Sequence, residues 1–156
     1  MTPDQFIIRV YGIVINKRNE VLLSDEFVLN MKMTKFPGGG LQLGEGIADG
    51  LKREFAEECN GQEIENLRHF YTTDFYQKAL FYENAQLISI YYLVDLKSPL
   101  RFSVSDKAFD FEIGSAVTQS FRWVKINELQ EDGITFPIDK FVVNKLKEMH
   151  ADKEDQ

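Results

Sequence analysis

Three glutamates, Glu54, Glu57 and Glu58, stand at spacings that make them neighbours on one surface of a helix. Like charges at these spacings repel each other and destabilise the bare helix. A divalent cation between the carboxylates would reverse the sign of that interaction. Because the candidate ligands are carboxylate oxygens, hard ions such as Mg²⁺ or Mn²⁺ fit them better than zinc.

The helix that must carry these glutamates is predicted from Glu45 to Asn60. Apolar residues recur there at helical spacing and fall on one arc, at Ile47, Ala48, Leu51, Phe55 and Cys59. Glu54 lies at the border of this arc and Glu58 just inside it, so both should be partly shielded from water. Asn60 and Gly61 tolerate the left-handed conformation and should end the helix.

Gly50 stands one turn before Glu54 on the same side of the predicted helix. Glycine in a helix costs roughly 1 kcal/mol relative to alanine. We therefore expect the missing side chain to leave room for a metal ion or a phosphate beside the carboxylates.

A glycine-rich segment, Phe36 to Gly40, precedes the helix and should break the chain's regular structure. Taken alone, three helical glutamates usually form a solvated face, and three glycines usually form a turn. In combination they resemble the Nudix box: glycine, five residues, Glu, seven residues, then Arg-Glu-apolar-x-Glu-Glu-x-Gly-apolar. Gly39, Glu45 and the run Arg53 to Glu58 match every position. Only the end differs, where Asn60 and Gly61 stand.

The resemblance implies an α/β fold, the Nudix-type α/β/α sandwich with a mixed β-sheet, in one domain over residues 1–156. It also implies roles for the box residues. Glu54 and Glu58 would be the principal ligands of Mg²⁺ (or Mn²⁺), with Glu57 and a carbonyl near Gly39 adding to them.

The same resemblance implies that Arg53 and Glu45 pair and hold the glycine loop against the helix. The reaction would be attack by water on a diphosphate, with a nucleoside diphosphate linked to another moiety as the substrate. Many family members carry an extra glutamate about five or six residues before the tryptophan of a late strand, but residues 117–120 contain no carboxylate. Glu112 and Asp110 lie upstream and could serve as the general base, and Glu112 is our first candidate. Glu54, Glu57 or water activated by the metal are the alternatives.

Substrate contacts are predicted less sharply. Phe75 and Tyr76 could stack on a base or sugar, and Tyr76 stands near a position where dinucleoside polyphosphate hydrolases carry tyrosine. Lys35, just before the glycines, could contact a phosphate. The ordinary alternatives are core or dimer packing for the aromatic residues and an exposed position for the lysine. Family members are often dimers, and the segment from Phe75 to Tyr82 is a candidate contact in a homodimer.

Composition limits the partners. The net charge of -7 argues against nucleic-acid or anionic-membrane binding, which need basic surfaces. The chain has one cysteine and no apolar run of membrane-spanning length, so we expect a cytoplasmic protein that acts on a small-molecule diphosphate. The alternative function is a Nudix-fold module that binds a nucleotide or sugar nucleotide without cleaving it. Such modules usually lose box glutamates, and this chain retains all three.

The remaining elements are expected as follows. Phe6 to Ile15 and Val21 to Leu23 should form a β-hairpin, and Asp25 to Lys35 should hold a loop and a short strand. Strands are predicted at Ile64 to Thr72, Gln86 to Leu96 and Ala116 to Ile126, with a helical turn at Asn127 to Gln130. Pro137 to His150 should form an amphipathic helix, and the charged tail Ala151 to Gln156 should fray.

Overall fold

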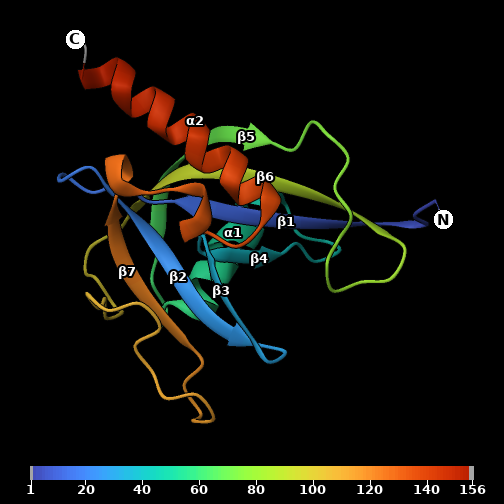
Figure 1. Cartoon of the computed structure of the whole chain (residues 1–156), viewed down its shortest axis with the longest axis horizontal. Coiled ribbons are helices and arrows are strands. Elements are labelled where there is room, and N and C mark those ends of the chain that lie inside the picture. Colours follow the sequence, from blue (N-terminus) through green and yellow to red (C-terminus); the bar gives the residue numbers. More distant parts are fainter. Residues whose placement is uncertain (1, 155–156) are drawn as a thin grey trace. The chain divides into compact units, whose positions relative to one another are not determined.

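The computed structural model describes residues 2–154, and its chain divides into two compact units. The first unit contains Met1–Ile13 and Pro37–Phe102, and the second contains Val14–Phe36 and Ser103–Gln156. The elements of both are labelled in Figure 1. Within the described residues, no helix combines the length and the apolar character needed to cross a membrane.

The first unit is a four-stranded mixed sheet with a helix. The strand order is β4 (Gly38–Gly40), β1 (Gln5–Ile13), β6 (Ala85–Leu96) and β5 (Ile64–Thr72). β1 runs parallel to β6, and the other two pairings are antiparallel. Helix α1 (Ile47–Glu58) packs on β4, β1 and β5. Its apolar side chains Leu51 and Phe55 are fully buried, as is Cys59 just after it, so these members of the predicted apolar arc form the packed face. Ala48, at the start of the arc, is exposed.

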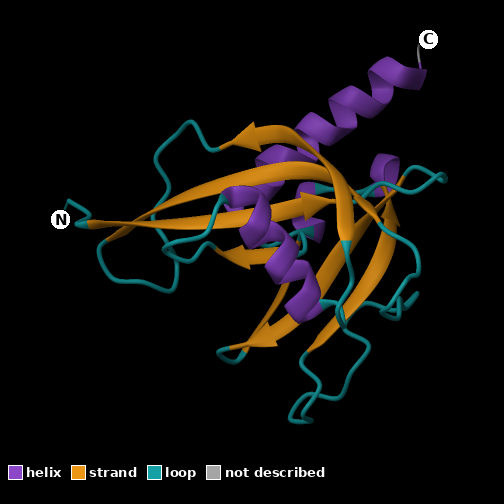
Figure 2. Cartoon of the chain, turned by 180° about the vertical axis from the view of Figure 1, so that it is seen from behind, coloured by secondary structure: helices purple, strands orange, loops and turns teal. Residues whose placement is uncertain are grey.

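The second unit is an antiparallel sheet in the order β3 (Met31–Lys35), β2 (Glu20–Val28) and β7 (Gln119–Lys125). Two short 3₁₀ helices, η1 (Ile126–Glu128) and η2 (Glu131–Gly133), contact α2 (Pro137–Glu154). Figure 2 colours the helices, the strands and the loops differently, and the loops include the long irregular segment between β6 and β7.

A buried charge holds the second unit together. Asp25 is fully buried in β2 and accepts hydrogen bonds from Arg122 Nε at 2.7 Å and from the hydroxyl of Thr34 at 2.7 Å. Oδ2, the oxygen that accepts the Arg122 bond, also accepts the backbone N–H of Phe109 at 3.2 Å. Asp25 therefore ties β2 to β3, to β7 and to the irregular segment.

The hairpin predicted in the N-terminal half is only partly present. β1 and β2 do not form a hairpin ladder, because β1 pairs with β4 and β6 while β2 pairs with β3 and β7. The two segments are joined locally by the bridge between Ile15 and Val21 and by the N–H groups of Asn16 and Leu22, which donate to the carbonyls of Glu20 and Val14 at 3.0 Å each. The loop and short strand predicted between Asp25 and Lys35 are confirmed, although the loop is only a tight turn. β2 continues to Val28, and a two-residue turn with positive φ at Leu29 and Asn30 leads into β3.

The other predicted elements are confirmed with small shifts. β5 has the predicted bounds, β6 begins one residue earlier, and β7 is shorter than the predicted strand at both ends. α2 extends to Glu154, so residues 151–154 of the predicted frayed tail are helical, and residues 155 and 156 lie outside the described part. The α/β class with a mixed sheet is confirmed.

Candidate active site

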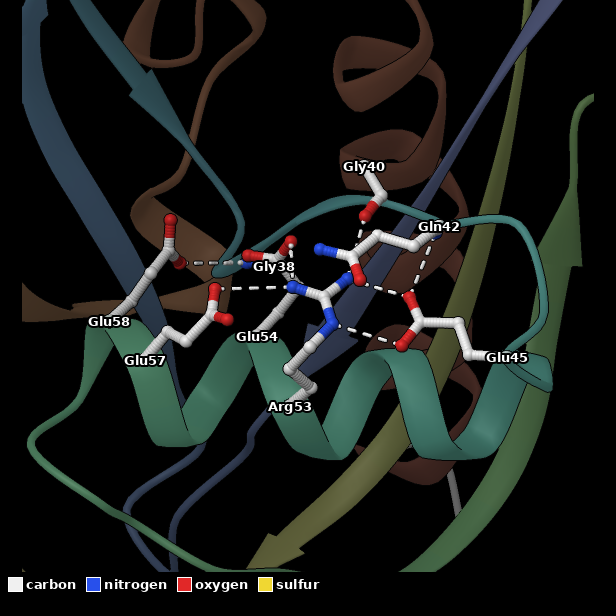
Figure 3. Close-up of polar contacts among 8 residues, drawn as sticks. All are labelled: Gly38, Gly40, Gln42, Glu45, Arg53, Glu54, Glu57 and Glu58. Atoms are coloured by element: carbon white, nitrogen blue, oxygen red, sulfur yellow. Dashed lines mark hydrogen bonds and ion pairs between the residues drawn. The ribbon is translucent and has the colours of Figure 1, made fainter.

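The three glutamates lie in the second half of α1, beside the glycine strand β4 (Figure 3). Their exposures differ because the helix packs on the sheet along one side. Glu54 is buried, with 9% of its surface exposed, whereas the Glu57 side chain is 58% exposed. Glu58 is intermediate between them. The expectation that Glu54 and Glu58 are partly shielded is therefore confirmed.

Arg53 is the centre of the polar network in Figure 3. Its guanidinium binds Glu45 through Nε at 2.9 Å and through Nη2 at 2.7 Å, in the bidentate arrangement. Nη1 lies 3.1 Å from Glu54 and 3.1 Å from Glu57. Nη2 also donates to the carbonyl of Gly40 at 2.9 Å. One side chain thus fixes the helix, the loop before it and two candidate ligands.

These contacts set the charge of the pair. The hydrogen bonds from Arg53 and from the backbone N–H of Gln42, the latter at 2.8 Å, lower the pKa of Glu45 from its usual 4.5 to about 2. The hydrogen bond with Glu45 raises the pKa of Arg53 above its already high usual value. Both groups are therefore ionised at neutral pH, which keeps the loop attached to the helix.

Two glutamates reach the glycine strand. The backbone N–H of Gly38 donates to Glu58 Oε2 at 3.4 Å. A Cβ atom added to Gly39 would lie 2.5 Å from Glu54 Oε2, so the Glu54 carboxylate occupies the space of the missing side chain. Gly38 has φ of +146°, and a Cβ there would meet the carbonyl of Val10 at 2.1 Å. The first two glycines of β4 are thus required by close packing.

The oxygen donors of this site suit a hard divalent cation. Glu54 and Glu58 approach the glycine strand from α1, and Glu57 is held by Arg53 beside them. Within residues 2–154, no three acidic, histidine or cysteine side chains are placed so that they could hold a metal ion as they stand.

The expectation for Gly50 was wrong. A Cβ on Gly50 would lie 2.6 Å from Leu41 Cδ1 and 3.0 Å from Glu45 Oε1. The space beside Gly50 is filled by the loop that precedes α1, which packs on the helix at this point. Gly50 therefore serves the docking of this loop and leaves no room for a metal ion or a phosphate.

The other predicted site residues lie apart from this network. Phe75 and Tyr76 belong to the first unit, in the segment between β5 and β6, with 39% and 59% of their surfaces exposed. Lys35 and Glu112 belong to the second unit. The Lys35 side chain is 5% exposed, with Nζ 3.0 Å from Glu26 Oε2, and Glu112 is exposed in the irregular segment.

Sequence reasoning missed two members of the network, because both contribute backbone atoms. The carbonyl of Gly40 binds Arg53, and the N–H of Gln42 binds Glu45. The sequence signal for both residues is the spacing between Gly39 and Glu45. The short loop between these positions returns to the helix, and Gly40 and Gln42 lie in that loop. The predicted helix end is confirmed: Asn60 and Gly61 have positive φ, and the N–H of Gly61 donates to the carbonyl of Ala56 at 2.8 Å.

Comparisons with known proteins agree with this geometry. Residues 6–144 match the family model of the NUDIX domain. A sequence comparison with curated proteins gives no match. Among solved structures, MutT from a study of Aliivibrio salmonicida and Vibrio cholerae is 22% identical, with a TM-score of 0.60, covering 92% of this chain and 98% of that one.

Two further structures have the same fold. A NUDIX hydrolase from Nitrosomonas europaea is 18% identical, with a TM-score of 0.65, covering 94% of this chain and 90% of its own. The E. coli ORF135 protein is 17% identical, with a TM-score of 0.68, covering 94% and 92%. At these identities the structures support the fold, while the family model spans most of the chain and carries the assignment. The chain with the Arg53 network and the glutamates of α1 belongs to the NUDIX domain family, whose hydrolases generally cleave pyrophosphate bonds.

Proposed function

We propose that this protein is a metal-dependent pyrophosphohydrolase that cleaves the diphosphate of a nucleoside diphosphate linked to another moiety. The observation that carries the proposal is the placement of Glu54 and Glu58 at the glycine strand, with Arg53 holding both the strand and the helix. A binding module would not need three carboxylates gathered beside backbone that is free of side chains.

The glutamates and Arg53 would have different roles in this reaction. Glu54 and Glu58, with Glu57, would hold Mg²⁺ or Mn²⁺, which when bound activates water and neutralises phosphate oxygens. Arg53 already satisfies part of the charge of Glu54 and Glu57, at 3.1 Å each, so it holds these carboxylates in place. Glu45 anchors Arg53. The chain's net charge of -7 makes a cation essential for attracting a diphosphate.

The general base stays a prediction with several candidates. Glu57 is exposed on α1 next to the principal ligands, so it can reach a water molecule on the solvent side of the site. Glu112 is exposed in the second unit, on the irregular segment. A comparison of E57Q with E112Q separates them. The base variant should lose the alkaline plateau of kcat against pH, and the other variant should keep it.

The other proposals concern substrate, assembly and location. Phe75 and Tyr76 are exposed enough to stack on a base or sugar. Lys35 is buried and paired with Glu26, so the predicted phosphate contact would require Lys35 to exchange this ion pair for a phosphate oxygen. Exposed rings from Phe75 to Tyr82 are the proposed contact of a homodimer. A cytoplasmic location is part of the same proposal.

A screen of nucleoside diphosphate derivatives with Mg²⁺ or Mn²⁺ tests the function. The wild type should release a monophosphate and a phosphorylated partner, and E58Q should lose on the order of 10²-fold or more in kcat, because a principal ligand is gone. E65Q is the matched control, since Glu65 is exposed on β5 of the same unit. Tight binding of one compound without turnover would instead favour the non-catalytic binding module.

A further inference from the structure

Arg9 is a cation beside the glycine strand that the proposed chemistry has not used. It lies on β1, and its Cα pairs with that of Gly40 on β4. Gly40 is also the residue whose carbonyl accepts the hydrogen bond from Arg53, at 2.9 Å. The backbone of Arg9 is therefore one strand away from the network that holds the glutamates.

The side chain of Arg9 lies on the face of the sheet opposite α1. Val10 pairs with Gly39, whose missing side chain would point at Glu54 on the helix. Residues alternate between the two faces of a strand, so Arg9 and Tyr11 point to the other face. β4 is the edge strand and consists of three glycines. β4 therefore places no side chain between the glutamates and Arg9, and a Cβ added to Gly40, the partner of Arg9, would meet no atom within 4 Å.

The guanidinium of Arg9 is oriented but only partly used. Its Nε donates to the hydroxyl of Tyr11 at 2.6 Å, and its Cζ lies 5.6 Å from the centre of the Tyr11 ring. Within residues 2–154, no carboxylate is within ion-pair distance of Arg9, and its terminal nitrogens have no acceptor. In the same part of the chain, no enclosed side-chain nitrogen lacks a partner, so these nitrogens reach solvent.

Arg9 is a half-buried cation. Burial lowers its pKa, and Tyr11, Tyr82 and Glu54 raise it, with a net rise above the usual value, so the side chain stays charged. Arg68, another arginine of this unit, is paired with Asp95 at 3.5 Å. A half-buried cation without a counter-ion is costly unless an anionic ligand offsets it.

We propose that Arg9, oriented by Tyr11, binds a phosphate group of the substrate through its two terminal nitrogens. The planar guanidinium matches two phosphate oxygens, which a lysine ammonium cannot do. This inference rests on the proposed function, since it takes the diphosphate as the ligand of the site. In this proposal the cation that binds the phosphate comes from β1, on the face of the sheet away from α1.

Calorimetric titration with methylenediphosphonate in the presence of Mg²⁺ tests the proposal, because this probe contains two phosphorus groups and no base or sugar. R9Q should weaken binding by about tenfold or more, and R9K by less. Y11F should weaken it a few-fold, because Nε loses its acceptor. R101Q is the matched control: Arg101 is exposed in the same unit, and removing the same charge there should change binding less than about twofold.

Each outcome decides the proposal. Equal binding by R9Q and R101Q, or no binding of the probe by the folded wild type, overturns the role of Arg9. Adenosine is the second probe, and if R9Q weakens adenosine binding while leaving that of the diphosphonate unchanged, Arg9 contacts an uncharged part of the ligand and the proposal fails. Thermal unfolding of each variant shows whether it is folded. If R9Q is not folded, the binding measured with R9K decides the test.

The two proposals fail in different ways. If no diphosphate is hydrolysed but the probe binds through Arg9, the enzyme proposal fails and the Arg9 site stands. If hydrolysis occurs and R9Q has the KM and kcat of R101Q, the Arg9 site fails and the enzyme proposal stands.

Discussion

Gly39 and Glu54 are in such close contact that a change at one must move the other. A Cβ on Gly39 would lie 2.5 Å from Glu54 Oε2, whereas a Cβ on Gly40 would have no atom within 4 Å. Neither residue has the left-handed φ that favours glycine. The two glycines thus differ in what their missing side chains leave room for.

This difference predicts unequal effects of one substitution. G39A should displace the Glu54 carboxylate, raise the Mg²⁺ concentration needed for half-maximal activity and lower kcat by about tenfold or more. G40A should change both by less than about threefold, so it is the matched control. Equal effects of the two substitutions would contradict the placement of Glu54.

The Arg53–Glu45 pair predicts a pH dependence of stability. The pKa of Glu45 is lowered from 4.5 to about 2, so the folded state gains from its ionised form above pH 4.5. That gain is lost as the pH falls from 4.5 toward 2. Wild type should therefore unfold less easily than E45Q at pH 7, and the difference should shrink across this window.

Urea unfolding at several pH values measures that difference. E65Q is the control, because Glu65 is exposed and makes no ion pair within residues 2–154. A difference between wild type and E45Q that stays constant from pH 7 to pH 2 would show that Arg53 does not hold the Glu45 carboxylate.

At the scale of elements, α1 works because a loop docks on its first turns. Leu41 and Glu45 fill the space beside Gly50. The carboxylate of Glu45 also accepts a hydrogen bond from Arg53, further along the helix. A leucine at position 50 would overpack this contact. G50L should lower the free energy of unfolding by about 1–3 kcal/mol and weaken activity through the displaced loop.

The control for this prediction is A48L on the same helix. Ala48 is exposed, so a larger side chain there should cost less than about 0.5 kcal/mol. If G50L keeps wild-type stability and loses activity alone, the space beside Gly50 serves a ligand after all.

The sequence predicts the elements of this fold unevenly, for physical reasons. α1 and β5 have strong periodicity and clear ends, such as the left-handed Asn60 and Gly61, and both were predicted. The partner of β1 could not be predicted, because apolar strands of similar character do not specify which one pairs with which. The end of β2 within the mixed stretch from Asp25 to Lys35 could not be predicted, because Asp25 is buried and compensated by Arg122, a contact that only the folded sheet supplies.

The site was predicted where side chains repeat a pattern and missed where the backbone acts. The box residues from Glu45 to Glu58 come together as the spacing requires. Gly40 and Gln42 contribute a carbonyl and an N–H, which any residue has, so composition cannot reveal them. Arg9 lies far from the box in sequence and reaches it only through the pairing of β1 with β4.

At the scale of the whole molecule, we propose that the two units unfold as one domain. The chain passes from one unit to the other three times, between residues 13 and 14, 36 and 37, and 102 and 103. Trp123 is the one tryptophan of the chain and lies on β7 of the second unit. Its fluorescence and the far-ultraviolet circular dichroism of the whole chain should therefore change at the same temperature.

The variant D25N sharpens that test. Removing the charge of buried Asp25 leaves Arg122 without its partner, which should cost about 3–5 kcal/mol in the second unit. If the units form one domain, both probes should shift together to a lower temperature. Separate transitions would show that the units unfold independently.

The most direct test of the central claim is a metal titration of diphosphate hydrolysis by wild type, E54Q and E58Q. Release of monophosphate is followed while Mg²⁺ is raised from zero, with E65Q as the control. We predict hydrolysis that depends on Mg²⁺ in wild type and E65Q, and a loss on the order of 10²-fold in the other two variants. Hydrolysis that proceeds without a divalent cation, or that survives E54Q and E58Q unchanged, would contradict the assignment of these glutamates as metal ligands.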